Sequence, residues 1–324
     1  MGGELDMSAL FIVGNGFDIA HGIPSEYRKF REFLIRKYPE ALEFRDEKIY
    51  LEDADEIEQE EFAAEILLSA LDQVDGPDWE DFEASLAHVN FSKKLPGPEL
   101  YGDETDEKDT FLMQQYLLYM DRLTSGFIAC AKKYWQEFFQ QWLRELQIPI
   151  KLDNFEKKDS LSRLFRRTDM KFFTFNYTKT LEKLYGINLV THIHGTVGQN
   201  LIFGHGEKDI MYEPFSGEQE NGIVIRSSFL DDMLQSFQKD TDFAQIRNKK
   251  FFRGLNTSID QVYSYGFSYG KVDGVYIKRI IRKISSDAVW YFTEFESQDK
   301  ESLRIKKVKL RNYGFKGTFG VYEG

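Results

Sequence analysis

"FIVGNGFDIAHGI", residues 11–23, is followed by Pro24 and is the stretch that decides the fold. An apolar run ends at Val13, and glycines follow at positions 14, 16 and 22. A strand ending in a tight turn would need these glycines because glycine tolerates positive φ. A nucleotide-binding loop would need them because backbone N–H groups then approach a phosphate at a helix N-terminus. The rest of the chain has to decide between the two interpretations.

Composition limits the class of protein. Of the 324 residues, 42% are hydrophobic and 30% charged, which predicts a folded, soluble protein. The net charge of −12 argues against a general nucleic-acid surface, which requires an excess of basic residues. The single cysteine, Cys130, excludes a disulfide framework and cysteine-rich zinc modules, and "FIACAKKYW" around it predicts a buried thiol on an amphipathic helix. With no signal peptide and no long apolar run, we expect a cytoplasmic protein without a membrane partner.

The pattern of apolar runs predicts an α/β fold. The expected strands are 8–13, 170–175, 187–195, 200–206, 259–265 and 287–295. A helix capped by Ser25 is expected over 26–38, and residues 43–147 read as mostly helical. We therefore expect one domain, 1–324, with a Rossmann-like parallel sheet from 8–30 and 165–300 and a helical insertion at 40–150. The basic segment 304–311 is expected to be a solvated edge strand.

Large side chains recur at helical spacing within residues 111–147. They are Phe127, Trp135, Phe138, Trp142 and Leu146. They cover more surface than one helical stripe needs, so they belong either to the core or to an interface with a second copy. We keep a homo-oligomer as a prediction, with the core as the alternative.

Four loops after expected strands carry unusual residues. They are "GNGFD" (14–18), "FNYT" (175–178), "HIHG" (192–195) with "GHG" (204–206), and "YGFSYGKVD" (265–273). In an open parallel sheet, ligands bind at the carboxyl ends of the strands, so these loops should meet. The amide of Asn176 suits a ribose or nicotinamide group, although it would also hold a turn. Asp18 and Asp273 suit ribose hydroxyls, and Asp273 equally suits the N-cap of its helix.

Histidines gather in the same region. Neutral histidine suits general-base catalysis because its ordinary pKa is about 6.5. His192, His194 and His205 would also make three zinc ligands. No H-E-x-x-H spacing or acidic cluster accompanies them, so we expect no metal.

Five segments together resemble the AbiH family of bacterial abortive-infection proteins. They are "LFIVGNGFDIAHGIPSEYRKF", "WEDFE", "FTFNYTKTLEKLY", "HIHG" with "IFGHG", and "YGFSYGKVD". They spread over nearly the whole chain. The resemblance implies a role in phage defence.

A more distant resemblance is to the sirtuin-like NAD-binding proteins. "GNGFDIAHGIP" is similar to their Gly-Ala-Gly-Ile-Ser segment with its later Gly-Ile-Pro, "FNYT" to their Asn-x-Asp pattern, and "HIHG" to their catalytic His-Gly. The resemblance implies a sirtuin-like fold with NAD as substrate or ligand. The residues expected to be catalytic are His194, Asn176 and Asp18. The residues expected to bind NAD are Gly14, Asn15, Gly16, Phe17, Pro24, Tyr177, Gly195, His205, Gly266, Ser268 and Asp273.

The chain also departs from the sirtuin pattern. Asp18 stands where that pattern has Ser, and Thr178 where it has Asp. A deacylase is excluded because its zinc module needs four cysteines. We expect a phage-defence effector that hydrolyses NAD to nicotinamide and ADP-ribose, with a phage-derived trigger as a further partner. The alternative is a nucleotide sensor without hydrolysis, or a nuclease-type toxin, using the same pocket.

Overall fold

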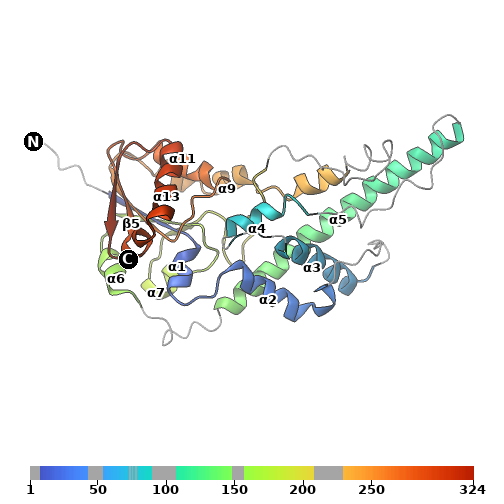
Figure 1. Ribbon diagram of the computed structural model, residues 1–324, viewed down its shortest axis with the longest axis horizontal. Coiled ribbons are helices and arrows are strands. Elements are labelled where there is room, and N and C mark those ends of the chain that lie inside the picture. The colour runs from blue at the N-terminus through green and yellow to red at the C-terminus, as the bar shows by residue number, and fades with distance from the viewer. Residues whose placement is uncertain are drawn as a thin grey trace, which may run out of the picture.

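The computed structural model describes residues 8–42, 54–72, 74, 76, 79–89, 107–147, 157–207 and 229–324. In these residues, six parallel strands form one sheet in the order β3-β2-β1-β4-β5-β6 (Figure 1). They are β1 (Ser8–Val13), β2 (Met170–Thr174), β3 (Val190–His192), β4 (Ile259–Tyr265), β5 (Val289–Thr293) and β6 (Thr318–Tyr322). The order reverses direction between β1 and β4, which makes this pair the topological switch point.

Strand β1 is buried on both faces, which explains its unbroken apolar sequence. Leu10 and Ile12 face α9 (Thr241–Arg247), α10 (Lys249–Arg253) and α11 (Gly274–Ile281). Phe11 and Val13 face α1 (Asn15–Ala20), α6 (Asp159–Leu164) and α7 (Thr180–Tyr185). Helices thus cover both faces, and the predicted Rossmann-like α/β fold is confirmed.

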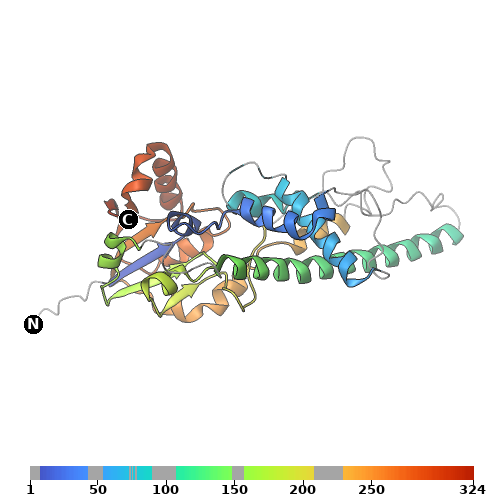
Figure 2. The same ribbon diagram turned by 90° about the horizontal axis from the view of Figure 1, so that it is seen from below.

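A helical body lies beside the sheet (Figures 1 and 2). It contains α2 (Tyr27–Lys37), η1 (Pro39–Leu42), α3 (Glu56–Asp72), α4 (Trp79–Ser85) and the long α5 (Glu107–Gln147). These helices share one apolar cluster, which also takes in Leu201 and the helical segment at 229–236. The predicted helical insertion is confirmed, and its packing extends beyond residues 40–150.

The large side chains of α5 pack inside this body. Phe127, Trp135, Phe138, Trp142 and Leu146 are all buried within the chain. The core alternative therefore accounts for them, and self-association stays a prediction without their support. Cys130 is also buried, as expected, and burial raises the pKa of its thiol to about 12.

Some expected elements differ in the structure. Residues 200–206 form no strand, because both amide atoms of Gln136 on α5 bind the backbone of Leu201, leaving an isolated bridge at His205. Residues 304–311 lie in helix α13 (Lys300–Asn312), whose first turn is capped by Asp299, and β6 forms the sheet edge instead. Ser25 donates to Asn15 rather than capping α2, which begins without a side-chain cap.

The described helices include no candidate for a membrane-spanning segment. Among the helices in the described residues, none combines the length and the apolar content that a membrane span needs.

Gly266, directly after β4, offers a test of how the loops fit together. Its φ is +60°, and a Cβ there would lie 2.5 Å from Cα of Gly16. We expect Gly266→Ala to lower the free energy of unfolding by about 2–4 kcal/mol, from left-handed strain plus overpacking. Urea unfolding measures this loss. Gly186→Ala is the matched control, because Gly186 has φ +70° but no atom within 4 Å of its Cβ position. It should lose only about 1 kcal/mol, and equal losses at both positions would contradict the overpacking.

Candidate functional site

A cavity of about 1090 Å³ opens at the carboxyl ends of β1, β2 and β4. It lies at the switch point, where ligands bind in doubly wound sheets. Its volume is at the upper end of the roughly 300–1,000 Å³ typical of small-molecule sites. Residues from all four loops singled out in the sequence line it, together with residues of α4, α5 and α13.

The glycine loop packs tightly against the loop after β4. The Gly14 N–H donates to Tyr265 O at 2.9 Å, and the Gly16 N–H donates to Gly266 O at 3.0 Å. A Cβ on Gly14 would lie 2.5 Å from Gly266 O. The Phe17 N–H donates to Gly14 O at 3.0 Å, so these amides already bind protein carbonyls. The glycines are accounted for by the contact between the two loops, while Gly14, Asn15 and Gly16 still line the cavity.

Asn176 and Asp18 connect β1 to the loop after β2. The Asn176 side-chain amide donates to Gly14 O at 3.0 Å. The buried Asp18 carboxylate accepts hydrogen bonds from the hydroxyls of Thr178 and of Thr180, the latter at 2.7 Å. Burial raises the pKa of Asp18, although these hydrogen bonds oppose the shift. Asn176 and Asp18 both line the cavity, and both also hold its wall together.

His194 lies in the turn after β3 and is 3% exposed. Its Nε2 lies 3.2 Å from Asp273 Oδ1, and this carboxylate is its polar partner. The ring also hydrogen-bonds to the backbone of Phe175. Burial, and then Lys239, lower the pKa of His194 to about 4. At neutral pH the imidazole is therefore uncharged and able to accept a proton.

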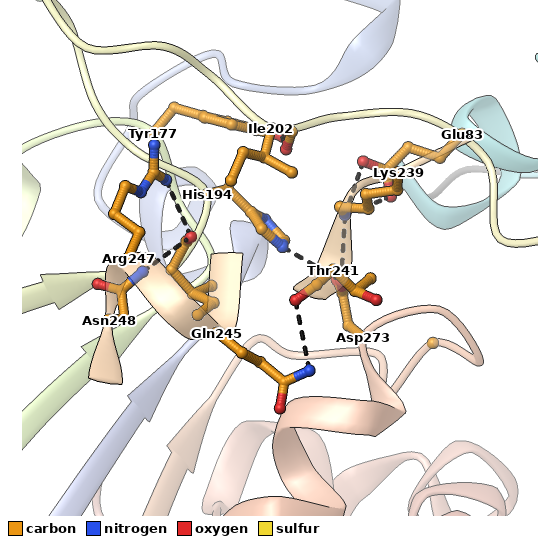
Figure 3. A network of polar contacts seen from close by, with 12 residues as sticks. Glu83, Tyr177, His194, Ile202, Lys239, Thr241, Gln245, Arg247, Asn248 and Asp273 are labelled. Carbon is orange, nitrogen blue, oxygen red and sulfur yellow. Dashed lines mark hydrogen bonds and ion pairs between the residues drawn. The ribbon is translucent and has the colours of Figure 1, made fainter. Parts of the chain in front are cut away.

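Lys239 completes a buried charge network with Glu83 and Asp273 (Figure 3). Its Nζ lies 2.8 and 2.9 Å from the Glu83 oxygens and 3.1 Å from Asp273 Oδ1. Burial opposes ionisation of both Asp273 and Lys239. The opposite charges prevail at these two residues, so that the pKa of Asp273 is lowered and that of Lys239 raised. At Glu83 burial prevails and raises the pKa of its carboxyl to about 7. Asp273 stands at the N-cap position of α11, but its side chain makes no cap hydrogen bond. It faces the network instead.

The other expected binding residues divide into two groups. Tyr177, Gly266 and Ser268 line the cavity. Four others are not among its lining residues: Phe17, Pro24, Gly195 and His205. The Phe17 side chain packs in the core, Pro24 is exposed, and Gly195 forms a turn with φ +87°. His205 is buried with Nε2 2.7 Å from Leu234 O. None of these four residues forms part of the cavity wall.

The histidines do not converge. His192 lies 2.9 Å from Asn176 O through Nδ1 and 2.9 Å from Glu182 Oε1 through Nε2, whereas His194 faces Asp273 and His205 faces Leu234. Within the described parts of the chain, no three His, Cys, Asp or Glu side chains are grouped to hold a metal ion. His192 contacts the backbone of Asn176, which is part of the cavity wall, but is not itself among the residues that line the cavity.

The sequence analysis did not identify Glu83 or Lys239 as a site residue. Glu83 ends "WEDFE", a segment that resembles the AbiH family but that reads as an ordinary amphipathic helix. Lys239 lies in a mixed segment without periodicity. No local pattern pairs two charges that are so far apart along the chain.

The fold and the cavity together define a doubly wound α/β protein with a buried charge network at its topological switch point. A family model described as "Bacteriophage abortive infection AbiH" matches residues 10–294. The chain belongs to the AbiH family. No curated protein and no solved structure gives a significant match to it.

Proposed function

We propose that the protein acts in abortive infection by binding NAD in the switch-point cavity and hydrolysing it to nicotinamide and ADP-ribose. The observation that carries the proposal is the position of His194. Its Nε2 is buried in the wall of a nucleotide-sized cavity and lies 3.2 Å from the Asp273 carboxylate. A neutral imidazole oriented by a carboxylate in a cavity wall is a candidate general base.

The chemistry follows from the groups in the wall. The bond between the nicotinamide nitrogen and ribose C1′ breaks, and its electron pair leaves with nicotinamide. Water then attacks C1′ and gives its proton to the neutral imidazole of His194. The Asp273 carboxylate, 3.2 Å from Nε2, stabilises the imidazolium that forms. Asn176 would hold the nicotinamide amide or the attacking water.

The departures from the sirtuin pattern are compatible with this proposal. Asp18 and Thr178 hydrogen-bond to each other across the first two loops. An acid on one loop and a hydroxyl on the other are therefore retained, with their positions exchanged. This pairing supports a similar use of the two loops.

Nicotinamide release tests the proposal. Purified protein is incubated with NAD, alone and with lysate of phage-infected cells, and nicotinamide is measured. We expect release in at least the second condition. NAD binding without release in both conditions would favour a sensor, and degradation of DNA or RNA would favour a nuclease-type toxin. Absence of NAD binding would overturn the proposal.

A further inference from the structure

Any nucleotide diphosphate in this cavity needs a cation, because the wall is acidic. Eight carboxylates and five lysines line it. The amides of Gly16 and Phe17 are engaged with protein carbonyls, so the glycine loop offers these two donors to no phosphate in this conformation. We therefore look for the cation among the side chains of the cavity wall.

Four of the five lysines already have a carboxylate partner. They are Lys239 with Glu83 and Asp273, Lys271 with Glu207, Lys306 with Glu296, and Lys309 with Glu80, at 2.6–3.6 Å. Lys158 is different, because among the described residues it has no ion-pair partner. Its ammonium group lies 5.5 Å from the centre of the Tyr265 ring.

The position of Lys158 is fixed relative to the glycine loop. Its backbone N–H donates to the Tyr185 hydroxyl at 3.1 Å, and that hydroxyl lies 2.6 Å from His21 Nε2. His21 in turn bonds Phe17 O at 2.7 Å. Tyr265 ends β4, and its carbonyl accepts the Gly14 N–H. Lys158 thus stands at the β1/β4 switch point itself.

We infer that Lys158 is the cation that binds the diphosphate of the nucleotide, an inference that rests on the proposed NAD site. Lys158 has no counter-ion within the described parts of the chain, and it gains a partner when a phosphate enters the cavity. Hydrogen bonds between charged groups contribute about 1.5–3 kcal/mol, or roughly a 10- to 100-fold change in affinity. Lys158 adds no affinity for the part of the nucleotide that carries no phosphate.

Calorimetry with defined probes tests this role. The probes are ADP-ribose and inorganic pyrophosphate, which carry the diphosphate, and adenosine, which lacks it. We expect Lys158→Met to weaken ADP-ribose and pyrophosphate binding at least 10-fold, with adenosine binding unchanged and a weaker salt dependence. Lys158→Arg should retain most of the affinity. The matched control is Lys157→Met, because Lys157 is the exposed neighbour and is absent from the cavity wall.

The outcomes separate the two proposals. If the wild type binds ADP-ribose and Lys158→Met binds it equally well, the role of Lys158 is wrong and the proposed function stands. Equal losses in Lys157→Met and Lys158→Met would also overturn it, because general surface charge would then explain the effect. If the wild type binds neither ADP-ribose nor NAD, the nucleotide site itself is wrong.

Discussion

His194→Ala is expected to lower the rate of NAD cleavage by about 10²–10⁴-fold, the usual value of a general base. NAD affinity should change little, because the imidazole acts on the proton of the attacking water. The variant loses the contacts of the ring with Asp273 and with the Phe175 backbone, so urea unfolding is measured alongside to show that it is folded. Nicotinamide release and NAD calorimetry on the same preparation measure the two effects separately.

The pH profile gives a second readout for His194. Because burial and Lys239 lower its pKa to about 4, the imidazole stays neutral well below the ordinary value of 6.5. Cleavage by the wild type should therefore persist as the pH falls below 6 and decline only near 4. His88→Ala is the control, since His88 is exposed and lies outside the cavity wall. Full activity in His194→Ala would mean that another group takes the proton.

Lys239→Met is expected to cost about 3–5 kcal/mol of folding free energy at neutral pH. Removing one partner of a buried ion pair leaves the other charge uncompensated, and here two carboxylates are left together. Glu83→Gln added to Lys239→Met should recover part of the loss, because only one buried carboxylate then remains. Urea unfolding of the wild type, the single variant and the double variant measures the coupling.

The pH dependence of Lys239→Met has a defined sign. Without the ammonium, Glu83 and Asp273 repel each other in a buried place, which raises their pKa values above those of the unfolded chain. The folded variant then binds more protons than the unfolded one, so its stability should rise as the pH falls from 7. In the wild type the two carboxylates act in opposite directions. The lowered pKa of Asp273 stabilises the fold above about pH 4 and less below it, whereas burial raises the pKa of Glu83 to about 7, which makes the fold more stable as the pH falls through 7. A variant that weakens further on acidification from pH 7 would contradict this account.

Much of the sheet could be predicted because its strands are apolar on both faces. The runs at 8–13 and 170–174 are too apolar for any exposed face, and a glycine or asparagine soon follows each. The strand predicted at residues 200–206 is absent for a physical reason. Gln136, distant in sequence, forms hydrogen bonds with the backbone of Leu201 that a neighbouring strand would otherwise form. The edge strand predicted at 304–311 is a helix instead, in which Lys306 pairs with Glu296, Lys309 pairs with Glu80, and Leu310 is buried.

The candidate site could be predicted only in part. Asn176, His194 and Asp273 follow predicted strands, and parallel strands bring their carboxyl ends to one edge of the sheet, so these residues were expected to lie close together. All three line the cavity. The alternation of strand residues put His192 and His194 on one face, but β3 ends at His192 and the chain turns, so the two rings have different partners. Glu83, on α4, and Lys239, which directly follows the isolated bridge at Gln238, lie outside such reasoning, because charged residues usually face water and their burial depends on tertiary contacts alone.

The position of β1 at the centre of the sheet has a consequence for the order of assembly. Phe11 lies beside Phe172 and Tyr263, so the first strand finds its neighbours only after most of the chain has been synthesised. Most of the helical body, from Tyr27 to Leu146, leaves the ribosome before either neighbour exists. The helices of this body pack on one another, which shortens the loop that β1 must close, and loop closure costs more entropy as the loop lengthens. We therefore expect the helical body to keep the apolar first strand near the place where its neighbours arrive.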